Sequence, residues 1–291
     1  EDLSRGLGDV YKRQCRHHRQ GRNVMSDMPL RTLVLAGTAE SRAVIHALSD
    51  EPSVQLTASL AGATPNPAGL PVPTRVGGFG GPEGLAEYCR ENGVGLVIDA
   101  THPFARQITR NARAAAASLN IPCLRLERPP WHPEEGDDWR SFDSWQEMAD
   151  AIPPGERVFL AGGTQSIGIF TKRQDITLWA RALNVEGMEG PANTTFINAM
   201  PQLDKADERA TFETHGITLL CCKNSGGNAS FAKISAARDL GIPVWMLRRH
   251  VPEAGSDGDN STENYHIHDT VDGAVAATLR LAANAVSGWP G

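Results

Sequence analysis

Short apolar runs alternate with stretches of helical length along the chain from residue 30 onward. Runs such as TLVLAG, VGLVIDA and RVFLAG are as long as a buried strand, and each precedes a stretch with helical periodicity. Strands separated by helices form βαβ units, in which the strands run parallel and helices cover both faces of the sheet. The alternation therefore predicts an α/β fold with mostly parallel sheets.

This pattern occurs twice in the chain. Residues 95–126 and 216–247 align without a gap at a separation of 121 residues, and the triplet LAG ends a strand in each half. In this alignment His102 overlies Lys223, and both follow the carboxyl ends of strands, where open α/β sheets bind ligands. The repeat predicts two Rossmann-like parallel-sheet domains with a cleft between them.

Two segments interrupt the alternation of strands and helices. The stretch 127–139 is rich in proline and acidic residues and is the best candidate for a link between domains. We therefore expect an N-terminal domain over 28–128 and a C-terminal domain over 129–291. The polar stretch 252–264 predicts a flexible loop before a last helix.

The first 27 residues lack any periodicity. The hexapeptide DVYKRQ (9–14) is what a common sequencing adapter gives when translated, and CRHHRQGRN follows it. We expect residues 1–27 to be disordered adapter read-through or leader, with Met25 or Met28 as the start. A genuine basic tail or targeting segment is the alternative.

Composition narrows the class of protein. The net charge of −6 gives no indication of nucleic-acid binding, and no run approaches the roughly 18 apolar residues of a membrane span. The five cysteines form no C-x-x-C pair, which argues against a zinc site and a disulfide framework. We expect a cytoplasmic protein that binds no metal, membrane or nucleic acid. Its oligomeric state is open, with a monomer as the working expectation.

The first strand–turn–helix element, LVLAGTAESR (33–42), is a candidate anion site. Gly37 allows the turn that lets amides at the helix N-terminus face an anion, and Thr38 adds a hydroxyl. The full G-x-G-x-x-G spacing is missing, so a plain turn with Thr38 as helix cap and Glu40 as first-turn acid is an equal alternative. Arg42 is either a phosphate clamp or a solvated surface charge.

The second strand ends in SLAGAT (59–64), where a Rossmann fold meets the adenosine ribose. An acid there favours NAD and an arginine favours a 2′-phosphate, but this stretch has neither. The nearby VGGFGG (76–81) is glycine-dense, so its backbone can approach a ligand closely. A mobile connection with Phe79 as its packing anchor explains that stretch almost as well.

The stretch DATHPF (99–104) ends a buried strand on polar residues. Asp99 can cap the next helix or bond loop amides, which is the commonest use of such an acid. His102 is either a ligand contact at the mouth of the helix or a histidine satisfied by loop hydrogen bonds.

In the second half, KNSGG (223–227) forms a donor-rich turn that would attract an anion, and AGGTQS (161–166) adds another glycine loop. Four arginines follow strand ends, which in an acidic protein suggests a polyanionic small ligand. They are Arg125, Arg128, Arg248 and Arg249. Lys233, further down the helix, is interpreted as a surface charge.

These motifs together resemble one family. LVLAGTAESR, RVGGFGGPEGLAEY, VIDATHPFARQI, PCLRLERPPW and KNSGGNASFAKI occur here in the order and spacing of the precorrin-6A reductase family, including its cobalt-precorrin-6A counterpart, of cobalamin biosynthesis. The resemblance implies reduction of one C=C bond in a polycarboxylate macrocycle lying between the two domains, with NADPH or NADH as cofactor. Another NAD(P)-dependent oxidoreductase or epimerase, and a non-catalytic binding protein for an anionic ligand, are the alternatives.

The chain departs from the family pattern at three positions. Ala36, Ala63 and Thr164 stand where members usually have glycine, arginine and arginine. The missing arginines leave the choice between NADPH and NADH open.

The resemblance assigns the nucleotide to the first domain and the macrocycle to the second. His102 is the candidate catalytic residue, although water or a substrate carboxylate could equally donate the proton. The expected cofactor-binding residues are Gly37, Thr38, Ala39, Glu40, Arg42, Ser59, Leu60, Ala61, Gly62, Gly77, Gly78, Asp99, Ala100, Thr101 and Pro103. The expected substrate-binding residues are Thr164, Gln165, Lys223, Asn224, Ser225, Gly226, Gly227, Arg128 and Arg248.

Overall fold

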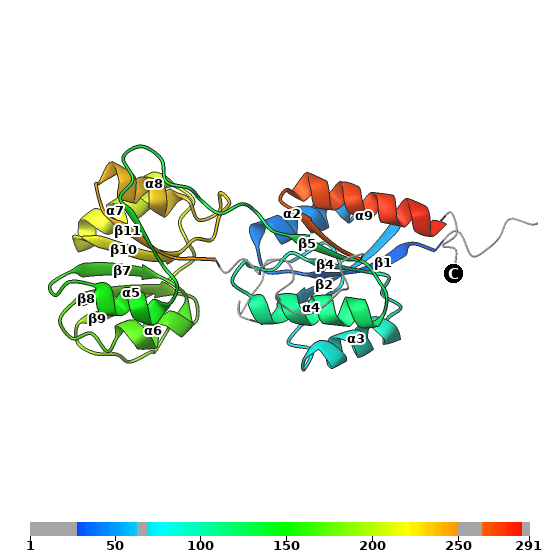
Figure 1. Ribbon diagram of the computed structural model, residues 1–291, viewed down its shortest axis with the longest axis horizontal. Helices are drawn as coiled ribbons and strands as arrows, with labels where there is room; N and C mark the ends of the chain where they lie inside the picture. The colour runs from blue at the N-terminus through cyan, green and yellow to red at the C-terminus, as the bar shows by residue number, and fades with distance from the viewer. Residues whose placement is uncertain (1–27, 63–68, 250–263, 287–291) are drawn as a thin grey trace, which may run out of the picture.

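The computed structural model describes residues 28–62, 69–249 and 264–286. Its described strands form two six-stranded sheets in which every neighbouring pair is parallel. Helices cover both faces of each sheet (Figure 1). The predicted α/β fold with two Rossmann-like halves is therefore confirmed. The expectations for residues 1–27, for Ala63 and for a loop after Pro252 lie outside the described residues.

The first sheet has the strand order β3-β2-β1-β4-β5-β12. This is the strand order of the dinucleotide-binding fold. The order in which successive strands are added to the sheet reverses between β1 and β4, and a crevice forms there at the carboxyl ends of the strands. The strands are β1 (Leu30–Leu35), β2 (Val54–Leu60), β3 (Thr74–Val76), β4 (Leu96–Asp99), β5 (Cys123–Leu126) and β12 (Tyr265–His268).

Four helices sandwich the first sheet. Alternate side chains of β1 enter two different cores, with Val34 on one face and Leu33 and Leu35 on the other. One face is covered by α2 (Ala39–Leu48) and α9 (Val271–Val286), and the other by α3 (Pro82–Glu91) and α4 (Arg106–Ser118).

The second sheet has the order β6-β11-β10-β7-β8-β9. Cys221 and Cys222 on β10 enter opposite cores, as expected for neighbours on a strand. The strands are β6 (Trp139–Phe142), β7 (Arg157–Ala161), β8 (Thr177–Ala182), β9 (Thr194–Asn198), β10 (Leu219–Lys223) and β11 (Val244–Leu247). The helices are α5 (Trp145–Ala151) and α6 (Thr164–Phe170) on one face, with α7 (Lys205–His215) and α8 (Ala232–Asp239) on the other.

The end of the chain does not belong to the second sheet. Residues of β12 pair with β5, beginning at Tyr265 opposite Cys123, and α9 packs against α2 in the first core. The expected C-terminal domain over 129–291 therefore has to be corrected, because its last two described elements complete the first sheet. The short edge strand β12 carries the sequence YHIH, which has too few apolar residues to be recognised as a strand.

The repeat also needs a correction in register. Cys123 and Val244, 121 residues apart, each begin a strand. Cys123 pairs with Val97, so a gapless alignment requires Val244 to pair with residue 218. Val244 pairs instead with Leu220, two residues further along the chain. Lys223 therefore corresponds to Ala100 and not to His102. Both positions still lie at the carboxyl edge of their sheets.

The two carboxyl edges face each other in the middle of the molecule (Figure 1). The loops that follow β1, β4 and β5 in the first half meet those that follow β10 and β11 in the second. No helix in the described part of the chain is long and apolar enough to cross a membrane.

Candidate functional site between the two sheets

The turn between β1 and α2 lies at the switch point of the first sheet. The hydroxyl of Thr38 accepts a hydrogen bond from the amide of Ser41 at 3.0 Å and donates one to the carbonyl of Ala100 at 2.9 Å. The hydroxyl of Ser41 accepts from the amides of Gly37 and Thr38. Thr38 is thus a helix cap, one of the two predicted roles. Gly37 has a φ of +131° and open space where a side chain would stand, which leaves room for a ligand over the turn.

Arg75 organises the end of β2, and the sequence analysis did not single it out. Its Nη1 donates to the hydroxyl of Ser59 at 2.8 Å and to the carbonyl of Gly77 at 2.9 Å, while Nη2 donates to the carbonyl of Gly78 at 2.9 Å. The guanidinium lies 3.8 Å from the ring centroid of Phe79, so that phenylalanine is a packing anchor. Its contact with Ser59 depends on the pairing of β2 with β3, which no local sequence motif indicates.

Asp99 is fully buried beneath the loop that follows β4. Its Oδ1 accepts from the amide and hydroxyl of Thr101, at 3.1 and 2.6 Å, and lies 2.9 Å from Nη1 of Arg125. The next helix begins at Arg106 with Ala105 as its N-cap, so Asp99 bonds the loop and does not cap the helix. The buried ion pair between Asp99 and Arg125 therefore fixes the loop that carries His102.

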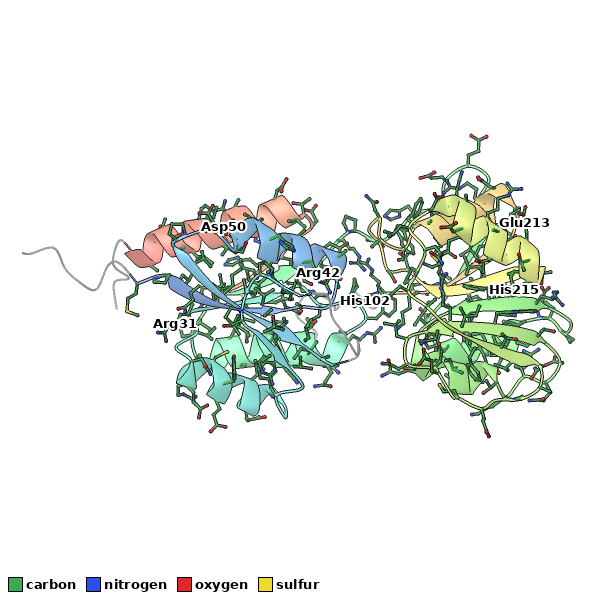
Figure 2. All side chains as sticks on the ribbon, turned by 180° about the vertical axis from the view of Figure 1, so that it is seen from behind. Arg31, Arg42, Asp50, His102, Glu213 and His215 are labelled. Carbon is green, nitrogen blue, oxygen red and sulfur yellow. The ribbon has the colours of Figure 1, made fainter. Side chains whose placement is uncertain are left out.

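His102 lies where the two halves meet (Figure 2). Its Nδ1 accepts a hydrogen bond from the amide of Phe104 at 3.2 Å, which places the proton of the neutral ring on Nε2. Burial, together with the charges of Arg128, Lys223, Arg249 and Arg125, lowers the pKa of His102 to about 3. The ring is therefore neutral near pH 7, in surroundings that favour negative charge.

The KNSGG loop packs against the segment that links the halves. The side-chain amide of Asn224 exchanges hydrogen bonds of 2.8 and 3.0 Å with the backbone of Trp131. The indole of Trp131 donates to the carbonyl of Gly227 at 2.9 Å. A side chain on Gly226 would lie 2.1 Å from the carbonyl oxygen of Pro129. The expected anion-binding turn is thus occupied largely by the chain's own backbone.

An ionic bridge joins the two halves at the same place. Arg128, at the start of the link, forms an ion pair with Glu40 on α2 and donates from Nε to the carbonyl of Ser225 at 2.8 Å. Arg249 donates to the carbonyls of Asn224 at 2.8 Å and Ser225 at 2.6 Å. Residues predicted separately as cofactor-binding and substrate-binding therefore contact one another across the junction.

Lys223 remains available to a ligand. Its Nζ lies 5.6 Å from the ring centroid of Phe104 and 3.6 Å from where a side chain on Gly163 would begin. Neither a hydrogen-bond acceptor nor a carboxylate partner for Nζ is found in the described residues. Burial lowers the pKa of Lys223. Thr164 and Gln165 are exposed at the adjacent start of α6.

Two basic residues lie elsewhere than expected. Arg248 is exposed and pairs with Asp143 at 2.5 Å, so the structure does not bring it together with Arg128. Lys233 is 4% exposed and not a surface charge: its Nζ donates to the carbonyl of Ser230 and lies 5.0 Å from the ring centroid of Trp131. Burial lowers the pKa of Lys233 to about 8.

The remaining predicted residues line the first half of the junction. The amide of Gly77 donates to the carbonyl of Leu60 at 2.8 Å, which ties the β2 turn to the glycine-rich stretch. Ala39, Ala61 and Gly62 are exposed, whereas Arg42 and Pro103 are half-buried. None of the described residues form a group of histidine, cysteine, aspartate or glutamate that could hold a metal.

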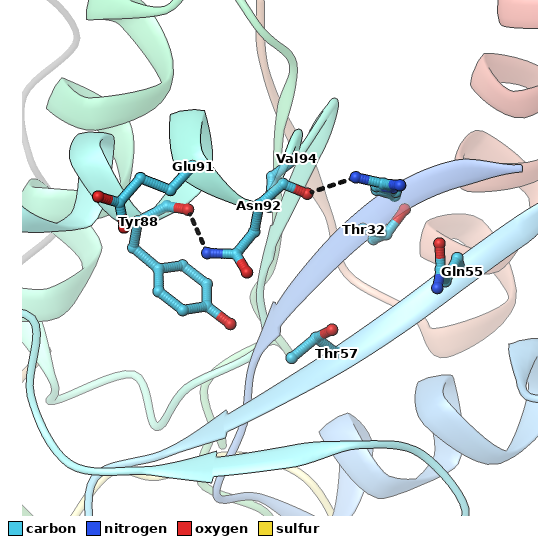
Figure 3. A pocket seen from close by; sticks show the side chains of 8 residues that line it. Thr32, Gln55, Thr57, Tyr88, Glu91, Asn92 and Val94 are labelled. Carbon is cyan, nitrogen blue, oxygen red and sulfur yellow. Dashed lines mark hydrogen bonds between the residues drawn. The ribbon is translucent and has the colours of Figure 1, made fainter. Parts of the chain in front are cut away.

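A polar pocket lies at the opposite end of the first sheet (Figure 3). Arg31 at the start of β1 donates to the carbonyl of Asn92 at 3.1 Å, and the Asn92 amide donates to the carbonyl of Tyr88 at 2.8 Å. Ligands of open α/β sheets bind at the carboxyl ends of strands, so this pocket is not the functional site.

Similarity to known proteins agrees with the arrangement of the two sheets. The precorrin-6A reductase of Rhodococcus erythropolis is 44% identical over 221 residues, which cover 75% of this chain and 89% of that protein. The cobalt-precorrin-6A reductase of Priestia megaterium is 30% identical over 186 residues, 60% of this chain and 72% of that one. The solved structure titled "CobK precorrin-6A reductase" matches with a TM-score of 0.78 and 34% identity, over 87% of this chain and 97% of that chain.

A family model gives the assignment. The model described as "Precorrin-6x reductase CbiJ/CobK" matches residues 31–275, which include both sheets and the junction between them. The chain therefore belongs to the precorrin-6x reductase family, and it is a reductase of the cobalamin biosynthesis pathway.

Proposed function

We propose that this protein reduces a C=C bond of precorrin-6A with a hydride from a nicotinamide nucleotide. The observation that carries the proposal is the meeting of two carboxyl edges, one from a sheet with dinucleotide-binding strand order and one that presents the lysine Lys223. A reductase of this kind needs both a nucleotide and a macrocycle within transfer distance, and facing edges supply that geometry.

The first half fits a dinucleotide. Open space stands over Gly37 at the switch point, and side chains on Gly77 and Gly78 would also meet nothing within 4 Å. These glycines, the exposed start of α2 and the hydroxyl of Ser59 would hold the phosphates and the ribose. When bound, the nucleotide supplies the hydride, while the chain provides position and electrostatics.

The second half and the linking segment suit a polycarboxylate. His102 is surrounded by Lys223 and three arginines. The arginines contact acids or carbonyls of the chain itself; they are Arg125, Arg128 and Arg249. Lys223 is the cation of this group that has no such partner within the described ranges. It would bind a substrate carboxylate through charge-assisted hydrogen bonds.

The proton for the neighbouring carbon would not come from an imidazolium, because the pKa of His102 is about 3. The neutral ring carries a hydrogen on Nε2 and can orient a substrate carboxylate or carbonyl as a donor. His102 is therefore assigned as a positioning contact. Lys223, whose pKa is lowered by burial, would bind a substrate carboxylate next to this ring.

Similarity favours the cobalt-free substrate. Relatives named precorrin-6A reductase are 37–44% identical to this chain, whereas those named cobalt-precorrin-6A reductase are 27–30% identical. The described cysteines are all free thiols, in keeping with the proposed cytoplasmic location.

Anaerobic mixing with precorrin-6A and NADPH or NADH tests this function. We expect one nucleotide to be oxidised for each macrocycle reduced. The absorbance of both chromophores measures the two reactions. Tight binding of the macrocycle with no oxidation of either nucleotide would contradict the proposal and favour a non-catalytic binding protein. The same assay with cobalt-precorrin-6A decides between the two substrates.

A further inference from the structure

We propose that Lys233 is a positioning residue for the macrocycle. Its buried ammonium group fixes the loop 223–230 against the linking segment, and so shapes the surface that receives the substrate. This inference rests on the proposed function, in which the loop belongs to the half that binds the macrocycle. Lys233 does not touch the substrate in this role, because it acts through the groups that it holds.

Lys233 contacts both the loop and the linking segment. It is the second residue of α8, and its Nζ donates to the carbonyl of Ser230 at the end of the loop. The same Nζ lies 5.0 Å from the ring centroid of Trp131 in the linking segment. A protonated amine is attracted to the face of an indole, and the attraction is stronger where water is excluded. One ammonium group thus joins the loop to the segment against which it packs.

Trp131 contacts the same loop at two further points. Its indole nitrogen donates to the carbonyl of Gly227 at 2.9 Å, and its backbone amide donates to the side chain of Asn224 at 2.8 Å. Lys223, which would bind a substrate carboxylate, directly precedes Asn224 in the chain. We therefore expect loss of the Lys233 contacts to loosen the loop and to disturb the position of Lys223.

The charge of Lys233 lowers the stability of the fold. Four groups act on it electrostatically: Glu208 on α7, Arg181 on β8, Arg128 in the linking segment and the thiol of Cys222 on β10. Glu208 is already paired with Arg181 at 2.8 Å, and Lys233 forms no ion pair with a carboxylate of the described ranges. Burial lowers the pKa of Lys233 from 10.5 to about 8, so the folded protein disfavours the charged form. A charge that is retained in spite of this cost favours a functional role over a purely structural one.

Two measurements on Lys233→Met test this role, because methionine keeps much of the apolar stem and removes the charge. The dissociation constant of precorrin-6A, measured without nucleotide, should rise about tenfold or more, while that of NADPH should stay within about twofold. Hydrogen exchange of the backbone amides in residues 224–230 should become about tenfold faster. Lys205→Met removes a half-exposed lysine that pairs with Asp239 on the same helix, and this matched control should change none of these values.

The pH dependence of binding tests the charge itself. Above pH 8 the wild type also loses the ammonium charge, so its advantage over Lys233→Met in binding precorrin-6A should shrink as the pH rises. Lys223 is present in both proteins, so its own titration cancels in the ratio of the two affinities. The melting temperature of Lys233→Met at pH 7 should be no lower than that of the wild type, because a buried charge has been removed.

Three outcomes overturn the proposal. They are unchanged affinity for precorrin-6A in Lys233→Met, unchanged exchange of the loop amides, and a wild-type advantage that is the same below and above pH 8. Absence of turnover by the wild type with either nucleotide would instead contradict the proposed function. The two failures are distinguishable, because macrocycle binding and amide exchange are measured without the reaction.

Discussion

The imidazole of His102 is kept neutral by burial and by four neighbouring cations, which lower its pKa to about 3. The unfolded chain binds a proton below the ordinary pKa of 6.5, and the folded protein does not until near pH 3. The contribution of His102 to stability is therefore complete above pH 6.5 and falls as the pH decreases from 6.5 towards 3.

This pH dependence can be measured directly. His102→Gln removes the titrating group, so its free energy of unfolding should decline less steeply than that of the wild type between pH 6.5 and 5, by up to about 1.4 kcal/mol per pH unit. Urea unfolding at a series of pH values is the measurement. Parallel declines in the two proteins would mean that His102 titrates normally in the folded state.

Lys223 gives a second test at the level of single residues. Lys223→Met should raise the dissociation constant of precorrin-6A about tenfold or more, because a charge-assisted contact is lost, and should leave nucleotide binding within about twofold. Lys172→Met removes an exposed lysine of the same half and serves as control. A larger effect on the nucleotide than on the macrocycle would mean that the two halves have the opposite roles.

At the scale of elements, the strands and helices with long apolar patterns were predictable from the sequence, and the edge strands β6, β9 and β12 were not. The sequence indicated a candidate site at Asp99, the last residue of β4, and in the loop after it, because a buried strand ends there on polar residues. Arg75 was missed because its contact with Ser59 joins residues 16 positions apart on neighbouring strands. The contact between Asn224 and Trp131 joins residues 93 positions apart, which no local pattern can indicate.

The KNSGG loop offers a test of its packing against the linking segment. Gly226 and Gly241 have almost the same backbone angle, with φ of +64° and +65°, but a side chain would meet Pro129 only at Gly226. Both alanine variants carry the cost of a positive φ, about 1 kcal/mol or more. Gly226→Ala should therefore lower the melting temperature clearly more than Gly241→Ala. Equal melting temperatures would show that this packing is absent in solution.

At the scale of the whole molecule, two separately predicted sites converge because the carboxyl edges of both sheets face each other. Glu40 was assigned to the nucleotide and Arg128 to the macrocycle, yet they form an ion pair, and Arg128 also donates to the carbonyl of Ser225 in the second half. β12 and α9 also tie the end of the chain to the first sheet. The chain therefore crosses between the two sheets twice, once after β5 and once before β12.

A double-mutant cycle measures the ion pair between Glu40 and Arg128 at the junction. Glu40→Gln and Arg128→Met should show a coupling energy of about 1 kcal/mol or more, because their side chains are only 20% and 12% exposed. The exposed pair Arg209 and Glu213 on α7 should give no more than about 0.5 kcal/mol. Additive effects of the two substitutions on unfolding would contradict the ion pair between Glu40 and Arg128 in solution.

Direct hydride transfer requires that a nucleotide on the first sheet and a macrocycle on the second lie close together. Anaerobic turnover of precorrin-6A with NADPH deuterated at the transferring position of the nicotinamide, in ordinary water, tests it by mass spectrometry of the product. We expect one deuterium in each reduced macrocycle, with the second new hydrogen coming from solvent. A reduced product without deuterium, or no reduced product, would contradict it.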